Sequence, residues 1–269
     1  MGRLLVFLGI IGIGFGATEM DWTNLSVKIS TTVPPSQKNV PKEELFSQFL
    51  KTFKELYFDA HQTVGEYLES HPIVAAKLQN TFFLPKRVGE KYLSDGSLQL
   101  QYEIMLQGGI LSSIIPKTGG GKPLTVLLCP LCKRPWPKDM PVPPGVHLIP
   151  KEEEYPIPYT GVLVDARGLN LNKALFPKIV NEDNQEVYGL GFVLRPYAIQ
   201  RGIVSYVHSS LEAYKNERLG TNPLRVVALR VTGKNKTDLV LPNSDAEKLH
   251  NSSQNLKLLK ECRVVILVD

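Results

Sequence analysis

The chain has 269 residues, of which 43% are hydrophobic and 21% are charged, and its formal net charge is +5. This composition excludes a chain that is disordered throughout, and the length leaves room for one large domain or two small ones. Lysine and arginine never occur in runs longer than two, so the clustered basic footprint of a typical nucleic-acid-binding protein is absent. We therefore expect no nucleic-acid partner.

Residues 1–17 have the pattern of a secretory signal peptide. Arg3 precedes an apolar stretch over residues 4–15, and the small residues Gly16 and Ala17 then open a polar sequence. The apolar stretch is shorter than the roughly 20 residues that a transmembrane helix needs. We therefore predict that residues 1–17 are removed on export, and that the mature protein lies in the periplasm or at the outer membrane without a transmembrane span.

Residues 18–115 are predicted to form an α+β domain. Apolar residues alternate with polar ones over 25–33, which predicts a half-buried strand. From Lys42 to Ser70 apolar residues recur at a spacing of three and four, which predicts one long amphipathic helix. Further elements are a short helix over 72–81 and two strands, FFLPKRV and SLQLQYEIML, split by a turn at 94–96. The predicted fold is a long helix packed on a small antiparallel sheet.

Residues 116–158 are predicted to form an irregular insert, because this segment holds 11 of the 20 prolines. The insert carries Cys129 and Cys132 in the sequence CPLC. Its glycine-rich stretch, GGGKP, lacks the residue spacing of a phosphate-binding loop. The cysteine pair is therefore the main candidate for chemistry in this segment.

Several types of site contain a Cys-x-x-Cys pair. Attachment of c-type haem is excluded because Lys133, and not histidine, follows the second cysteine. A zinc site needs four ligands, and with only Cys262 and five histidines left it would need distant residues or a second copy of the chain. Export favours a disulfide, while nearby prolines oppose the helix of a redox-active dithiol. Cys129 and Cys132 are thus predicted to form a disulfide or a zinc knuckle, with a thiol-dependent redox module as the less favoured alternative, and no cofactor other than zinc is expected.

Residues 159–269 are predicted to form a β-rich domain. The strands lie in TGVLVDARG, KIVNEDNQEVYG, LRVVALRVTGKNKTDLVLP and CRVVILVD, the last of which suits a central strand. Ser244 and Glu247 have the spacing of a capping box, which predicts a short helix after them. Asp165 and Arg167 are interpreted as an ion pair or turn at a strand end. Neither a nucleophile elbow nor a histidine pair on a helix occurs in the sequence, so we expect no enzymatic activity.

The segments DWTNLSVKISTTVPP and KYLSDGSLQLQYEIMLQGGI resemble the twenty-kilodalton lipoprotein family of bacterial envelope proteins, which is related to flagellar accessory proteins of the outer membrane. The segment YTGVLVDARGL is similar to the C-terminal part of longer secreted relatives, some of which carry a counterpart of the cysteine insert. The resemblance implies an exported, non-catalytic protein with envelope or flagellar partners. The lipid-attachment cysteine of the lipoprotein members is absent here. Exposed edge strands lead us to expect a homo-oligomer.

Overall fold

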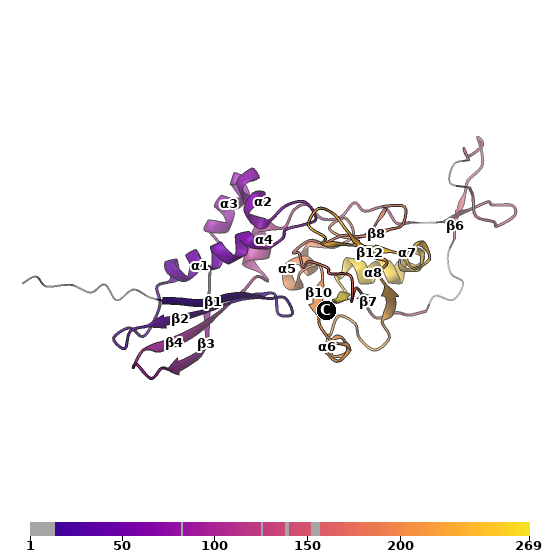
Figure 1. Ribbon diagram of the computed structural model, residues 1–269. Coiled ribbons are helices and arrows are strands. Elements are labelled where there is room, and N and C mark those ends of the chain that lie inside the picture. The colour runs from indigo at the N-terminus through magenta and orange to yellow at the C-terminus, as the bar shows by residue number, and fades with distance from the viewer. Residues whose placement is uncertain (1–13, 82, 125, 138–139, 152–156) are drawn as a thin grey trace, which may run out of the picture. The chain divides into compact units, whose positions relative to one another are not determined.

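The computed structural model describes residues 14–81, 83–124, 126–137, 140–151 and 157–269. These residues form two compact units, one from 14–54 and 83–106, the other from 55–81 and the described part of 107–269. Helices and several sheets occur together, and the C-terminal region is rich in β-structure, so the coarse α+β class is confirmed (Figure 1). Most of the predicted signal segment, residues 1–13, lies outside the described residues, whereas 14–17 belong to the first strand.

The first unit is an antiparallel sheet beneath one helix (Figure 1). Its elements are β1 (Gly14–Asp21), β2 (Ser26–Val33), α1 (Lys42–Glu55), β3 (Lys86–Tyr92) and β4 (Leu98–Met105), in the sheet order β1-β2-β4-β3. In the two central strands buried and more exposed residues alternate, and β2 pairs with β4 so that Val27 faces Ile104. The strands predicted from period-two alternation are confirmed, because a sheet with one covered face requires that pattern.

The single long helix predicted from Lys42 to Ser70 is wrong. Helix α1 ends at Glu55, and α2 (Val64–Ser70) begins only after a loop. Within the loop the Asp59 carboxylate accepts the backbone N–H groups of His61 and Gln62, which closes a turn that is incompatible with a helix. The apolar spacing continues through this loop because its side chains enter the core of the second unit instead.

Aromatic contacts show where the loop side chains go. The Phe58 ring stacks on Tyr67 at 3.9 Å between centroids and lies at 4.8 Å from Phe176. Thr63 then caps α2, with its side chain accepting the N–H of Glu66 while the Glu66 carboxylate accepts the N–H of Thr63. The apolar spacing therefore predicted correctly that these side chains are buried, but it did not predict the conformation of the backbone.

Two further short helices pack beside α2 in the second unit. They are α3 (Pro72–Gln79), which the sequence predicted, and α4 (Gly109–Ile114). The Lys77 ammonium group donates to the Ser112 carbonyl, and the hydroxyls of Thr81 and Ser113 share a hydrogen bond of 2.5 Å. These contacts tie the end of α3 to α4.

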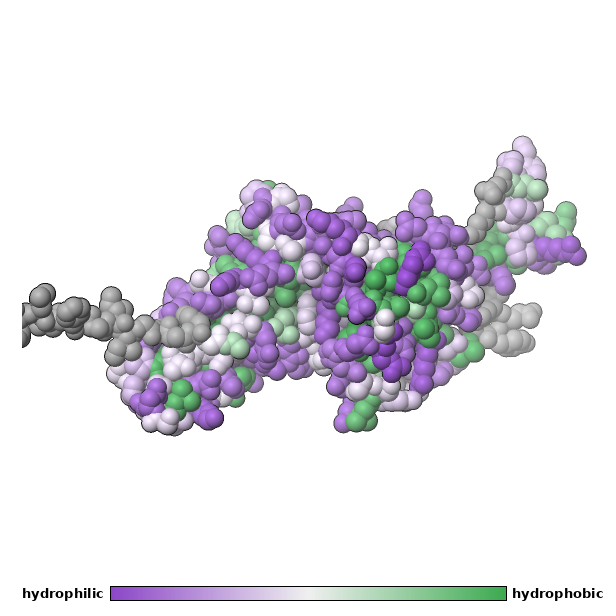
Figure 2. Space-filling model, viewed as in Figure 1, coloured by the Kyte–Doolittle hydropathy of each residue, from purple (hydrophilic) through white to green (hydrophobic). Residues whose placement is uncertain are grey.

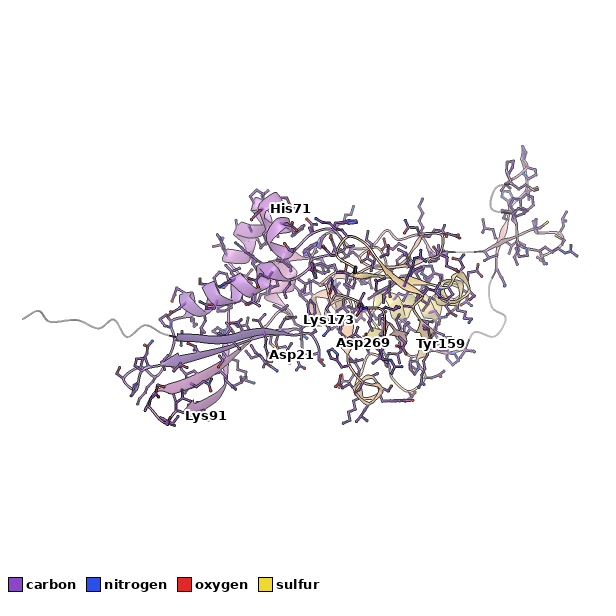
Figure 3. The ribbon with its side chains drawn as sticks, viewed as in Figure 1. Asp21, His71, Lys91, Tyr159, Lys173 and Asp269 are labelled. Carbon is purple, nitrogen blue, oxygen red and sulfur yellow. The ribbon has the colours of Figure 1, made fainter. Side chains whose placement is uncertain are left out.

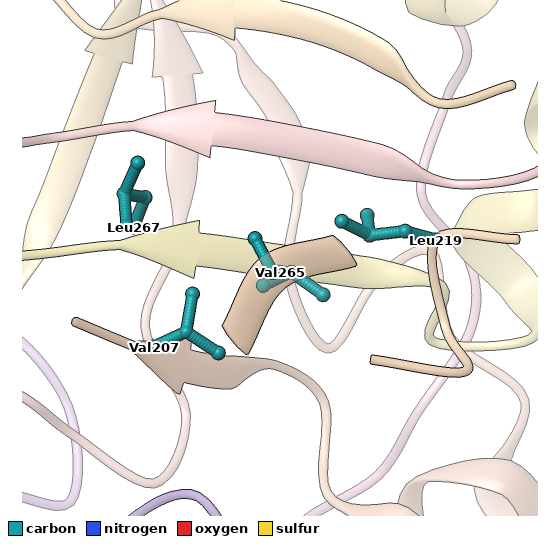
Figure 4. Close-up of a cluster of buried hydrophobic side chains, with 5 residues drawn as sticks. Val207, Leu219, Val265 and Leu267 are labelled. Atoms are coloured by element: carbon teal, nitrogen blue, oxygen red, sulfur yellow. The ribbon is translucent and has the colours of Figure 1, made fainter. Parts of the chain in front are cut away.

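A parallel sheet is the core of the second unit. Its strands are β7 (Val162–Asp165), β10 (Ser205–Val207), β11 (Leu224–Val227) and β14 (Val264–Leu267), in the order β10-β14-β7-β11. The prediction of CRVVILVD as a central strand is confirmed, since all residues of β14 are buried. Helix α6 (Ser210–Lys215) covers β10 and β14, where Ala213, Leu219 and Val265 pack together with Val207 and Leu267 (Figure 4).

A second sheet has the order β12-β13-β8-β9. Its strands are β8 (Ile179–Asn181), β9 (Glu186–Tyr188), β12 (Arg230–Thr232) and β13 (Asp238–Leu241). The strands predicted in these two segments are confirmed, and β8 pairs with β9 and β12 with β13 as antiparallel hairpins. In the second hairpin Gly233 and Lys236 adopt the left-handed conformation that the turn demands.

The remaining helices of this unit are α5 (Arg195–Arg201), α7 (Asn243–His250) and α8 (Ser253–Lys260). The capping box predicted at Ser244 is wrong, because α7 starts one residue earlier and Pro242 occupies the N-cap position. The expectation of a helix in this segment is confirmed. No helix in the described residues is long and apolar enough to cross a membrane.

Candidate functional site

The CPLC sequence lies at the tip of a small hairpin in the insert. Strand β5 (Leu127–Leu128) pairs with β6 (Ile149–Pro150) on one side, and Leu128 bridges to Pro135 on the other. The N–H of Cys129 donates to the Arg134 carbonyl over 2.9 Å, which closes the hairpin around the cysteines. The prolines that suggested irregular structure therefore flank an ordered turn.

A backbone hydrogen bond and a left-handed residue shape the turn that carries the two cysteines. The N–H of Lys133 donates to the Cys129 carbonyl at 2.9 Å, and Lys133 has a φ of 57°, in the left-handed region. The N–H of Cys132 contributes most to lowering the pKa of Cys129, followed by that of Leu131, and Lys133 adds a favourable charge.

The two thiols of the pair are accessible, whereas the third cysteine is not. Cys132 is exposed, Cys129 is half-buried, and neither is joined by a disulfide in this structure. Between them Leu131 is 92% exposed. Cys262 is fully buried in the second unit, where burial raises its pKa to about 11. Cys262 is therefore a core residue.

Ligands beyond the cysteine pair are not assembled in the described part of the chain. No group of three or more histidine, cysteine, aspartate or glutamate side chains suited to a metal is found there. His147, which follows the hairpin, is exposed. The acidic run Glu152–Glu154 lies outside the described residues. The structure thus brings Cys129 and Cys132 together as two adjacent donors.

The base of the insert is fixed to the core by a buried histidine. The Nδ1 atom of His250 accepts the Leu124 N–H at 2.8 Å, and Nε2 donates to the Val187 carbonyl at 2.7 Å. Burial lowers the pKa of His250, which keeps the ring neutral as this pattern requires. The sequence gave no sign of this role, because both partners are more than 60 residues away along the chain.

A cavity of about 1040 Å³ lies between the insert and the second sheet. The insert contributes the apolar side chains of Trp136, Met140 and Val142, while Phe192 and Glu247 line the opposite side. A cavity of this size and mixed lining can hold a small organic molecule or a peptide side chain. Among the lining residues that the structure describes there is no serine, threonine, cysteine or histidine.

A polar cluster lies at the carboxyl ends of the parallel strands, where ligands often bind in such sheets. The Arg167 guanidinium donates two hydrogen bonds to Asp165, at 2.9 and 2.6 Å, so the predicted ion pair is confirmed. Nearby, Lys173 Nζ lies 2.8 Å from His208 Nε2, and His208 Nδ1 lies 2.5 Å from the Asp269 carbonyl oxygen (Figure 3). These groups bond to one another and join a loop to the strand ends, which is a structural role.

One face of the parallel sheet is covered over only half its width. Residues paired across parallel strands share a face, so Val265, Leu163 and Arg225 lie on the side that carries α6. The helix covers β10 and β14, but on edge strand β11 Arg225 is exposed and Val227 is 65% exposed. We call this region, made of Leu163, Arg225 and Val227 with Leu211 and Tyr214 of α6, the open half-face.

The open half-face combines apolar, aromatic and cationic groups. Arg225 lies over the Tyr214 ring at 5.3 Å and donates to its hydroxyl at 2.7 Å. Leu211 and Tyr214 are 64% and 66% exposed. Hydrophobic residues gather on the visible face of this unit around β7 (Figure 2). Neither the strand pattern nor any motif marked this surface in the sequence.

The C-terminal part of the chain is similar to a domain of a known protein. A family model described as "Treponema pallidum Tp0624, second domain" matches residues 161–269. The match includes the parallel sheet, the open half-face and helices α5 to α8, and excludes the cysteine hairpin. No curated protein matches the chain.

Proposed function

We propose that this protein is an exported, non-catalytic assembly component of a bacterial cell envelope that acts by binding other proteins. The open half-face is the observation that carries this proposal. The signal-peptide pattern of residues 1–17 and the resemblance to envelope lipoproteins support the location. The same resemblance makes envelope or flagellar proteins the expected partners.

The reasoning starts from what a parallel sheet requires. Such sheets are normally covered on both faces, because their strands are apolar on both sides. Here the face opposite α6 is covered along β11, where Leu224 and Val226 are buried, whereas Val227 on the other face is open. A surface that exposes tyrosine, arginine and aliphatic side chains together has the composition of a protein interface.

The occupant that fits best is the open half-face of a second copy. Strand β11 is an edge strand, and its outward backbone groups can pair with the same strand of another copy about a twofold axis. This pairing would continue the sheet and bury Val227 on both copies. Homo-oligomerisation is therefore part of the proposed function.

Sedimentation velocity of the full mature chain, with chelator and reducing agent present, tests the proposal. We expect a concentration-dependent dimer that Val227→Glu converts to monomer, because a charged side chain would replace the apolar contact of Val227 in the interface. Val88→Glu, at a 47% exposed valine of edge strand β3, is the matched control and should leave the dimer intact. A wild-type protein that stays strictly monomeric at high concentration would contradict the proposal.

The envelope location is tested separately by fractionating cells. We expect the processed chain in the periplasmic or outer-membrane fraction. Recovery of the unprocessed chain in the cytosol would refute export, and would leave the dimer measurement unaffected.

A further inference from the structure

We propose that Cys129 and Cys132 are one half of a tetrahedral zinc site, which the same two cysteines of a second copy of the chain complete. The inference goes beyond the proposed function, since it concerns the hairpin of the insert and not the open half-face. It rests on the geometry of the turn, the accessibility of its tip and the number of ligands that zinc requires.

The turn is already arranged to hold a metal ion. Cys129 and Cys132 lie in one tight turn at the tip of the hairpin, which the hydrogen bond from the Cys129 N–H to the Arg134 carbonyl closes. The left-handed conformation of Lys133 and its hydrogen bond to the Cys129 carbonyl fix the chain where it leaves the second cysteine. The backbone of the tip is thus held in one conformation at both cysteines.

Thiolate donors select the class of ion. Sulfur ligands favour zinc over magnesium or calcium, which prefer oxygen. The tetrathiolate complex of Zn²⁺ carries a net charge of −2, and binding releases the thiol protons to solvent. Lys133 and Arg134 of each copy follow the cysteines directly and would offset that charge.

The count of ligands points to a second copy. A structural zinc ion takes four protein ligands, and the described residues hold no third donor beside the pair. The tip is accessible to the hairpin of a second copy, because Cys132 is exposed and Leu131 is 92% exposed. Meeting tip to tip would also bury the two Leu131 side chains, which supplies an apolar contact at the joint.

The test uses the full mature chain, purified under reducing conditions and loaded with zinc sulfate. Metal analysis should give one zinc ion for every two chains. Light scattering should show that the molar mass of the particle doubles when zinc is added. EDTA should reverse this doubling. Cobalt in place of zinc should give the visible absorption of a tetrahedral tetrathiolate. One zinc ion per monomeric chain would overturn sharing, and a chain that takes up no zinc while reduced would overturn the site.

Variants separate this dimer from the one at the open half-face. Cys129→Ser with Cys132→Ser should abolish zinc-dependent doubling, while His147→Ala, which removes the exposed histidine after the hairpin, should not. Loss of zinc binding in His147→Ala would refute a site made of cysteines alone. Val227→Glu should bind zinc and double as the wild type does. Circular dichroism of each variant establishes that the chain is folded.

Discussion

Replacement of His250 by alanine tests whether the base of the insert is held by a buried neutral histidine. The substitution leaves the carbonyl of the fully buried Val187 without its hydrogen-bond donor. An unpaired buried carbonyl costs about 1–3 kcal/mol. The lost ring also leaves a cavity beside Phe192, whose centroid lies 4.8 Å away. Together these effects predict a decrease of roughly 2–5 kcal/mol in the free energy of unfolding.

The same residue predicts a pH dependence with a definite sign. Burial lowers the pKa of His250 below its ordinary value of 6.5, so the unfolded chain binds a proton more readily than the folded one. Stability therefore falls as the pH drops below about 6.5, with a slope of at most about 1.4 kcal/mol per pH unit. The fall stops once the pH passes the lowered pKa of the folded state. His250→Ala lacks this contribution, so its stability should change less over the same range.

Urea unfolding at pH 7.5 and pH 5 measures both effects. Near-ultraviolet circular dichroism suits the assay, because Tyr188 and Tyr206 are buried in the second unit. His147→Ala, at an exposed histidine, is the control and should stay within about 0.5 kcal/mol of the wild type. A His250→Ala protein as stable as the control, or one with the pH slope of the wild type, would refute the reasoning.

Two further substitutions test the packing of the parallel sheet. Leu267→Ala, in the cluster beneath α6, should cost about 2–5 kcal/mol in urea unfolding, against less than about 0.5 kcal/mol for the exposed Leu84→Ala, and equal losses would contradict the assigned core. Gly161→Ala would place its Cβ 2.6 Å from Leu219 Cα, where backbone cannot yield, so we expect about 1–3 kcal/mol of destabilisation by thermal unfolding. In Gly89→Ala the nearest atom is the mobile end of Gln101, so a comparable loss there would show that the clash is not the cause.

Short-range patterns in the sequence predicted those helices and strands whose conformation depends on residues close by in the sequence. The alternation in β2 and β4 is visible in the sequence because one covered face imposes it directly on each strand. The helix break after Glu55 was not predictable in this way. Phe58 keeps the helical spacing but packs on Phe176, more than a hundred residues later, and that distant contact decides the backbone.

Of the two candidate sites, one could be identified from nearby residues in the sequence and the other depends on the tertiary fold. Cys129 and Cys132 could be identified from their spacing, and the left-handed Lys133 is a detail of the same local turn. The open half-face could not be identified, because it depends on which strands become neighbours. Only the register of β11 against β7 places Val227 on the half-covered side. Sequence reasoning also missed α6, although Ser209 and Glu212 carry the spacing of its N-terminal cap.

Strand order in the parallel sheet has a consequence for how the protein is made. Strand β7 is the first strand of this sheet to be synthesised. The strand that separates it from β10 is β14, and residues 166–263 must be synthesised between β7 and β14. Until β14 is released, β7 and β10 have no strand between them and the apolar interior cannot close. The second unit can therefore close only after strand β14 has been made and has inserted between β7 and β10.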